Sequence, residues 1–240
     1  MITITGLKKT YKHHQVLKSI DIEIHSGSVT AIVGPNGSGK TTLLKSILGL
    51  VIPESGSISV GGSTIKSSDQ YRKQIGYLPQ NHGFPANLKV KESIKLLQDL
   101  RTDVKDYDLE LYEAFGLEEY KNKQIKHLSG GTLQKLSAAI AFMFRPTLLI
   151  LDEPTSSLDP SASILLKDKI RKVNNEGVTV LLTSHIMPEV DELADEVIFM
   201  LEGCVRYKGS VTELKNIQET PSLEKAVANI IKMEFSPCLI

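Results

Sequence analysis

The sequence predicts an α/β fold with a mainly parallel sheet, an antiparallel β subdomain and an inserted helical subdomain. Short apolar runs that are typical of buried strands alternate with stretches whose apolar residues recur at helical spacing. Such alternation implies right-handed βαβ units, which build parallel sheets. The short β-rich runs that open the chain are assigned to the antiparallel subdomain. A helical stretch from about residue 85 to about residue 145 interrupts the alternation, so we interpret it as an insertion.

The first third of the chain is expected to consist mostly of strands. These strands are predicted at Ile2–Ile4, Ile20–Ile24, Val29–Val33, Ser57–Val60 and Ile75–Leu78. A helix fits Lys40–Leu48, and Gly49 closes it. The run Val29–Val33 is mostly apolar and ends at Gly34, as a buried strand that leads into a loop should.

The middle of the chain is expected to be helical, and alternation resumes after it. Helices are predicted at Val90–Leu100, Tyr107–Phe115, Gly131–Phe144, Ser161–Val173 and Pro188–Leu193. Strands are predicted at Leu148–Leu151, Val178–Thr183 and Val197–Leu201. No internal repeat is present, so we expect one domain over residues 1–215. A short helical tail over residues 216–240 follows it, with a helix near Leu223–Ile231.

The composition limits the possible partners. The chain has 240 residues, with 28 Lys and Arg against 28 Asp and Glu, which gives a formal net charge of zero. This balance argues against a dedicated nucleic-acid-binding protein, which usually carries an excess of basic residues. The N-terminus lacks a signal-peptide pattern, and no apolar run approaches the ~20 residues of a spanning helix. We therefore expect a cytoplasmic chain that meets a membrane only through a partner.

The strongest functional motif is the segment from Gly34 to Thr42. It contains a full G-x-x-x-x-G-K-[ST] pattern between a predicted strand and a predicted helix. Backbone N–H groups of such a loop surround a phosphate, and the helix N-terminus adds its positive dipole end. Lys40 is expected to reach the β- and γ-phosphates, and the Thr41 hydroxyl to ligate Mg²⁺. The predicted nucleotide-binding residues of the loop are Gly34, Pro35, Asn36, Gly37, Ser38, Gly39, Lys40, Thr41 and Thr42.

A second motif stands at the end of the strand Leu148–Leu151, where Asp152 and Glu153 follow. In enzymes with a phosphate loop, a carboxylate in this place holds Mg²⁺, which is the role predicted for Asp152. Glu153 is expected to orient or deprotonate the attacking water as a catalytic residue. Together with the loop, this motif predicts a P-loop NTPase core that hydrolyses a nucleotide.

A third motif, Leu128-Ser129-Gly130-Gly131, lies about twenty residues before Asp152 and opens a predicted helix. Taken alone it is best interpreted as a serine cap followed by glycines. In its place in the chain it resembles the signature motif of ATP-binding cassette (ABC) transporter ATPases. The resemblance covers nearly all of residues 1–215, and its other motifs occur in the family's order.

This resemblance implies roles for residues that would be unremarkable alone. Tyr11 matches the aromatic residue that stacks on adenine, and Gln80 matches the glutamine that touches Mg²⁺ and senses the transporter. Asp159, in Ser157-Leu158-Asp159, matches the loop that crosses the dimer interface. His185 matches the catalytic histidine that contacts the γ-phosphate, beside Glu153 and Lys40. The implied metal ligands are Thr41, Gln80 and Asp152.

The family also implies partners. Two cassettes pair head-to-tail, so that each ATP lies between the phosphate loop of one and Ser129–Gly131 of the other. The pair drives separate transmembrane permease subunits from the inner face of the membrane, and a homodimer of this chain is expected. The segment Asn81–Lys89 is expected either in the groove that receives the permease or as a plain exposed loop.

Two positions depart from the family pattern after Ser-Gly-Gly. Thr132 stands in place of the usual Gln, and Lys135 in place of the usual Arg. Lys135 retains the charge but lacks the planar fork of Arg. Thr132 removes an amide, so contacts to the ribose across the interface are in doubt. A narrower resemblance is to the ATPase of the copper-linked transporter that matures nitrous-oxide reductase. It depends on Leu128–Lys135, Ser137–Phe144 and Ser184–Val190.

Two other classes of protein fit the sequence less well. A cassette protein that acts on ribosomes or DNA usually carries two cassettes or a long insertion, and neither is present here. A phosphate-loop kinase or GTPase would leave Ser129–Gly131 and His185 unexplained.

Overall fold

The computed structural model describes residues 1–66 and 69–235, which divide into two compact units. The first unit comprises Met1–Asp69 and Leu181–Ile240, and the second comprises Gln70–Val180. Strand β8 (Thr179–Thr183) contains the point where the chain passes from the second unit back to the first. No helix in either described stretch is both long enough and apolar enough to cross a membrane.

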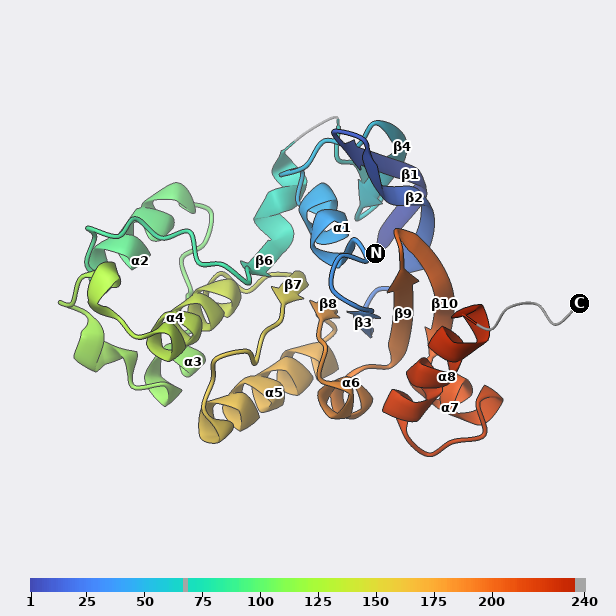
Figure 1. Ribbon diagram of the computed structural model, residues 1–240. Coiled ribbons are helices and arrows are strands. Elements are labelled where there is room, and N and C mark those ends of the chain that lie inside the picture. Colours follow the sequence, from blue (N-terminus) through green and yellow to red (C-terminus); the bar gives the residue numbers. More distant parts are fainter. Residues whose placement is uncertain (67–68, 236–240) are drawn as a thin grey trace, which may run out of the picture. The chain divides into compact units, whose positions relative to one another are not determined.

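An antiparallel sheet opens the first unit, as the sequence predicted. Its strands are β1 (Ile2–Tyr11), β2 (His14–Ile24), β4 (Ser55–Val60) and β5 (Ser63–Thr64), in the order β2-β1-β4-β5 (Figure 1). The pairing of β1 with β2 runs from Ile2 opposite Ile24 to Tyr11 opposite His14. Ile2 and Ile4 are buried while Thr3 and Thr5 are exposed, which gives the sheet one apolar face. β1 and β2 are longer than the runs seen in the sequence, because polar residues continue both strands.

The first unit also contains parallel pairing. Strand β3 (Val29–Val33) is buried throughout and pairs in parallel with β9 (Glu196–Leu201). Helix α1 (Lys40–Ile47) follows β3, and α6 (Met187–Leu193) precedes β9. Strand β10 (Cys204–Ser210) pairs antiparallel with β9, and it was not predicted from the sequence.

The first unit ends in two helices, α7 (Val211–Ile217) and α8 (Leu223–Phe235), which contact each other (Figure 1). The predicted helix Leu223–Ile231 lies within α8, whereas α7 was not foreseen. Leu223, Ala226 and Val227 are buried, so α8 packs along one apolar stripe. Residues 236–240 of the predicted tail lie outside the described residues.

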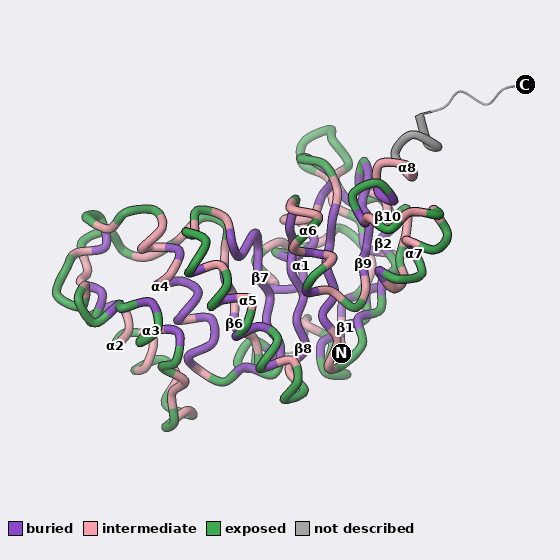
Figure 2. Tube along the Cα trace, turned by 90° about the horizontal axis from the view of Figure 1, so that it is seen from below, coloured by how far each residue is buried: buried purple, intermediate pink, exposed green. Residues whose placement is uncertain are grey.

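The second unit pairs β6 (Ile75–Leu78) in parallel with β7 (Leu148–Asp152), and it also contains helices, loops and the start of β8. The α-helices are α2 (Val90–Leu100), α3 (Glu110–Ala114), α4 (Gly130–Met143) and α5 (Pro160–Asn175). Short 3₁₀ turns cover Gln70–Gln74, Leu117–Tyr120 and Ile125–His127. Figure 2 shows β7 and much of α4 as buried, and eight residues of α4 belong to the core. Helix α3 is shorter than the predicted Tyr107–Phe115.

Candidate active site

The phosphate loop of the first unit joins β3 to α1 and is built on three glycines. Gly34, Gly37 and Gly39 have φ angles of 151°, 83° and 104°, a region that residues with a side chain rarely adopt. A Cβ atom on Gly34 would lie 2.1 Å from the Met200 carbonyl oxygen, and one on Gly39 would lie 2.8 Å from that of Val16. The loop therefore packs so closely on its neighbours that only glycine fits at these two positions.

The turn between β9 and β10 holds the phosphate loop through a backbone hydrogen bond. Gly203 N–H donates to the Ser38 carbonyl at 3.1 Å, and Lys18 N–H donates to the Gly203 carbonyl at 2.8 Å. Glu202 and Gly203 both have positive φ angles, 48° and 79°, as a tight two-residue hairpin turn requires. Sequence reasoning missed this support, although the Glu-Gly pair after an apolar run was its signal.

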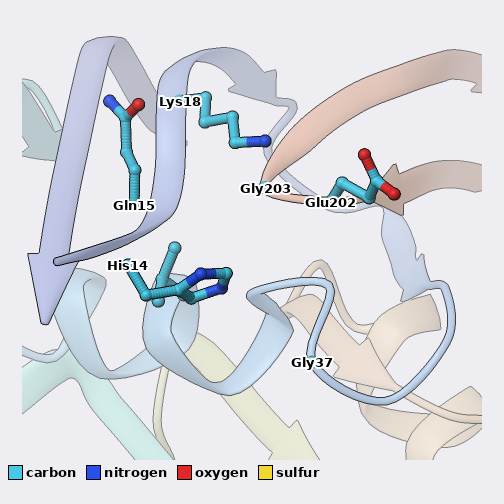
Figure 3. A pocket seen from close by; sticks show the side chains of 7 residues that line it. His14, Gln15, Lys18, Gly37, Glu202 and Gly203 are labelled. Carbon is cyan, nitrogen blue, oxygen red and sulfur yellow. The ribbon is translucent and has the colours of Figure 1, made fainter.

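A cavity of ≈ 260 Å³ lies beside the loop (Figure 3). Gly37 of the loop, the β1–β2 hairpin residues His14 to Val16, Lys18 and the Glu202–Gly203 turn line it. Its lining is mixed, because apolar Val16 lies among polar side chains that include Lys18. A cavity of this kind next to a phosphate loop offers room for the remainder of a nucleotide.

Two side chains of the loop are placed to meet an anion. The Lys40 ammonium donates to the carbonyls of Gly34 at 2.7 Å and Pro35 at 3.1 Å, which holds it across the loop. The Ser38 hydroxyl is buried and finds no hydrogen-bond partner among the described residues. Thr41 and Thr42 stand half-buried in the first turn of α1. Donors and a helix N-terminus gathered in this way suit a phosphate.

Two further predicted residues of the first unit are exposed. Tyr11 ends β1 with 46% of its surface accessible, and the Lys9 ammonium lies 5.2 Å from the centre of its ring. His185 follows β8, where the buried Ser184 hydroxyl accepts a hydrogen bond from Ile186 N–H at 3.0 Å. Both side chains are accessible to a ligand.

The second unit carries the acidic part of the site at the carboxyl end of β7. Asp152 is 2% and Glu153 8% exposed. Burial, and next to it the negative charge of Asp152, raise the pKa of Tyr77 to about 12. Gln80 is exposed two residues beyond β6. Since β6 and β7 are parallel neighbours, Gln80, Asp152 and Glu153 follow strand ends at the same edge.

The backbone at Glu153 is unusual, because its φ angle is 55° and the residue is not glycine. Its carbonyl accepts hydrogen bonds from Ser156 N–H at 3.1 Å and from the Ser156 hydroxyl at 2.8 Å. The buried Gln134 amide of α4 donates to the same carbonyl at 3.4 Å and to the Pro154 carbonyl at 2.8 Å. Gln134 was not predicted, since a glutamine within a helix carries no sign of such a distant contact.

The signature segment begins α4, and the cap predicted for it is confirmed. Ser129 is the N-cap, and its hydroxyl accepts from Thr132 N–H at 3.2 Å. Ser129 and Gly130 are exposed and Gly131 is half-buried. Asp159 likewise caps α5, because one carboxylate oxygen accepts from Ala162 N–H at 2.9 Å and the other from the Lys135 ammonium at 2.6 Å.

The predicted site residues are thus divided between the two units. Those of the first unit are Tyr11, the loop residues 34–42 and His185, and those of the second are Gln80, Ser129, Gly130, Gly131, Asp152, Glu153 and Asp159. A glycine loop between a buried strand and a helix, together with a strand that ends in Asp-Glu, defines the class of P-loop nucleoside triphosphatases.

Comparisons with known proteins identify the family. The sequence model described as "ABC transporter" matches residues 17–156. The chain is 35% identical over 224 residues to the uncharacterized ABC transporter ATP-binding protein YxlF of Bacillus subtilis, covering 92% of this chain and 74% of that protein. The chain belongs to the ABC transporter family, and it is an ABC ATPase with the α/β fold of that class.

Solved structures agree with this assignment. A structure described as the ATP binding subunit of an ABC transporter superposes with a TM-score of 0.87 at 26% identity, over 96% of this chain and 99% of that one. A dimeric structure of MJ0796, a bacterial ABC transporter cassette, superposes with a TM-score of 0.78 at 25% identity, over 88% of this chain and 98% of that one.

Proposed function

We propose that this chain is the ATP-hydrolysing subunit of a transporter, in which two cassettes close around two Mg-ATP molecules and drive a separate membrane permease. The observation that carries the proposal is that one chain presents two phosphate-binding features, one in each unit. The first is the loop at Gly34–Thr42, and the second is the exposed helix start at Ser129–Gly131. In a head-to-tail pair of cassettes, each ATP would contact the phosphate loop of one chain and the helix start at Ser129–Gly131 of the other.

ATP is held mainly by the first unit in this proposal. The exposed Tyr11 ring stacks on the adenine, and the cavity beside Gly37 lies next to the phosphate loop. The loop amides bind the phosphates, and the Lys40 ammonium turns from its carbonyl partners toward the β- and γ-phosphates. Thr42 adds a hydroxyl in the same turn of α1.

Thr41, Gln80 and Asp152 are the proposed Mg²⁺ ligands. A hydroxyl, an amide oxygen and a carboxylate are the hard oxygen donors that Mg²⁺ prefers. When bound, the ion neutralises charge on the phosphates during transfer.

Hydrolysis is assigned to three residues of the chain. Glu153 orients the attacking water and accepts its proton, because its carboxylate follows directly after the proposed Mg²⁺ ligand Asp152. His185 contacts the γ-phosphate, and Lys40 stabilises the charge that develops there. The unusual φ angle of Glu153 supports this assignment, because strained backbone concentrates at catalytic positions.

The second cassette is most simply another copy of this chain. MJ0796, to which the chain is similar, forms such a dimer. In the proposed dimer the Ser129 hydroxyl and the N–H groups of Gly130 and Gly131 meet the γ-phosphate bound by the partner, and Asp159 lies at the interface.

The permease is proposed to bind an apolar groove of ≈ 290 Å³ on the second unit. Phe84, Leu96, Leu97 and Ile140 are among its lining residues. The His82 Nδ1 atom lies 2.7 Å from the Ser137 hydroxyl, which fastens the segment after Gln80 to α4. Burial lowers the pKa of His82, so its ring stays neutral beside that hydroxyl. The chain would then lie at the inner face of the membrane, bound to the permease. Nucleic acid is not a partner in this proposal.

In this proposal the permease, and not this chain, determines which substrate is transported. The narrower resemblance suggests copper handling for nitrous-oxide reductase maturation. Among the described residues no group of three or more His, Cys, Asp or Glu side chains could hold a metal ion. Neighbouring genes that encode a permease and a periplasmic copper-site protein would support the copper proposal, and a sugar-, peptide- or drug-type permease would overturn it.

The Glu153→Gln variant tests the ATPase assignment. We expect it to lose about 100-fold or more in kcat and to accumulate as an ATP-bound dimer on size-exclusion chromatography. Hydrolysis at the wild-type rate would overturn the role of Glu153. Co-purification with a membrane protein supports the transporter function. Co-purification with ribosomes or DNA would instead favour the alternative, a soluble ABC ATPase that acts there.

A further inference from the structure

Helix α4 touches the loop after Glu153 at three points on one side. A Cβ atom on Gly131 would lie 2.9 Å from the Ser157 carbonyl oxygen, so the two backbones pass in close contact. Gln134 donates to the Pro154 carbonyl, and the Lys135 ammonium pairs with Asp159 at 2.6 Å. Positions 131, 134 and 135 have the i, i+3, i+4 spacing of one helix face. The first turns of α4 and residues 153–159 are therefore coupled.

Gln134 is the central contact of the three. It is 1% exposed, and its amide nitrogen donates to two successive carbonyls, at 2.8 Å to Pro154 and at 3.4 Å to Glu153. Buried carbonyls of this kind need hydrogen-bond donors, and the Gln134 amide is one of them. The bond spans about twenty residues of sequence, so it fixes the loop to a separate element rather than to its own turn.

The backbone of Glu153 has an unfavourable conformation, and the hydrogen bond from Gln134 helps to hold it. A φ angle of 55° places a residue with a side chain in the left-handed region, which persists only where the surroundings enforce it. This backbone angle sets the direction in which the Glu153 carboxylate leaves the end of β7. Ser156 supports the same carbonyl from within the loop, whereas Gln134 supports it from α4.

We infer that Gln134 is a positioning residue that transmits the state of the α4 start to the catalytic carboxylate. The inference rests on the proposed function, in which Ser129–Gly131 bind the partner's ATP while Glu153 acts on the chain's own ATP. A shift of α4 on binding the partner's γ-phosphate then moves the Gln134 amide and, through two carbonyls, Glu153. Because such coupling is reciprocal for binding, occupation of one ATP site should change the ATP affinity of the other site by the same factor.

The test uses Gln134→Met, which retains the length and apolar fit of the side chain but removes both donors. We expect kcat for ATP hydrolysis to fall about 10- to 100-fold, because small displacements of a catalytic group have effects of this size. ATP affinity of the monomeric chain should stay within about 2-fold, since the phosphate loop is untouched. The Hill coefficient for ATP should fall toward 1. A merely structural role would not move the Hill coefficient.

Gln124→Met is the matched control. Its amide also donates to a backbone carbonyl of the second unit, that of Asn87 at 3.2 Å, but far from Glu153 in the sequence. This variant should keep the wild-type kcat and Hill coefficient. If Gln134→Met fails to fold by thermal unfolding, Gln134→Asn, which shortens the reach by one methylene, is judged by the same criteria.

A second measurement separates this inference from the proposed function. In a Glu153→Gln background, Gln134→Met should lower the residual single-turnover rate by less than about 2-fold, because the carboxylate it positions is already gone. Full additivity of the two losses, or an unchanged kcat and Hill coefficient in Gln134→Met alone, would overturn the positioning role. Glu153→Gln with wild-type activity would instead overturn the assignment of Glu153 itself.

Discussion

The Ser129 hydroxyl lies 2.8 Å from the Thr132 hydroxyl, one helical turn further along α4. The same Ser129 oxygen accepts the capping bond from Thr132 N–H. When the Thr132 hydroxyl donates as well, the proton of Ser129 remains available for a phosphate on the partner. Thr132, which departs from the family pattern, therefore supplies a hydroxyl where a longer amide is usual.

Removing this hydroxyl should weaken the interface. We expect Thr132→Val to raise the ATP concentration for half-maximal hydrolysis about 2- to 10-fold, because one hydrogen bond is worth about 1 kcal/mol. The maximal rate should change less. Thr132→Ser retains the hydroxyl and should behave as wild type. Steady-state kinetics measures this ATP concentration in both variants. Equal changes in Thr132→Val and Thr132→Ser would contradict the role of the hydroxyl.

Gly39→Ala should disable the phosphate loop. The new Cβ atom would meet the Val16 carbonyl at 2.8 Å, and the φ angle of 104° is strained for alanine. We expect ATP affinity to fall about 10-fold or more, and the free energy of unfolding to fall by about 1–2 kcal/mol. Nucleotide titration and urea unfolding measure both quantities.

Gly62→Ala is the control for strain alone. Gly62 has a φ angle of 80°, but open space surrounds its Cβ position. This variant should lose about 1 kcal/mol of stability and retain its ATP affinity. A similar loss of affinity in both variants would show that packing against Val16 is not what shapes the loop.

Two strands that lead into the site were predictable because they are short runs of mostly apolar residues. Val29–Val33 and Ile75–Leu78 have the same bounds in sequence and structure. β10 was missed because its sequence, Cys-Val-Arg-Tyr-Lys-Gly-Ser, lacks an apolar run. Helix α3 begins later than predicted, since Asp108 N–H bonds to the Met143 carbonyl and Tyr107 packs edge-on against Phe144. Tertiary contacts there override helical spacing.

The chemical groups of the site were predictable, but their supports were not. Motif spacing predicts roles for Lys40 and Asp152 because phosphate and Mg²⁺ chemistry restricts residue type and order, and the family resemblance predicts the role of Ser129; these roles stay predictions. Gln134 and Gly203 act through backbone groups far away in sequence. The Glu-Gly pair at 202–203 indicates a turn but not its contact with Ser38, and a glutamine within a helix gives no sign of its partner. Only the fold brings them to Glu153 and Ser38.

A buried cation joins α5 to the segment before α3, and its loss should destabilise the second unit. The Lys169 ammonium lies 2.6 Å from Asp108 and 2.8 Å from Glu110, with 4% of its side chain exposed. Lys169→Met would leave the largely buried Asp108 carboxylate unpaired. We expect urea unfolding to show a loss of about 3 kcal/mol. Lys172→Met, whose side chain is 54% exposed, should lose clearly less stability than Lys169→Met.

The same variants should change the acid response of Glu110. Hydrogen bonds from Lys169 and then Lys172 lower the pKa of Glu110, so the stabilisation is present above its ordinary pKa and disappears as pH falls through the lowered value. In Lys169→Met the pKa should move back up, and protonation should begin at higher pH. NMR titration of the Glu110 carboxyl group measures this shift, and an unchanged pKa would contradict the pairing.

Binding of the permease should depend on the apolar groove of the second unit. Leu96 lines that groove with 46% of its surface exposed, so Leu96→Glu places a charge on an apolar surface that is already accessible to water. We expect the fraction bound to membranes that contain the permease to fall about 10-fold or more, as for a central interface residue. Leu100→Glu is the matched control, because Leu100 is 70% exposed on the same helix but does not line the groove. Equal loss of binding in both variants would indicate a response to added charge on α2, and equal retention would place the permease elsewhere.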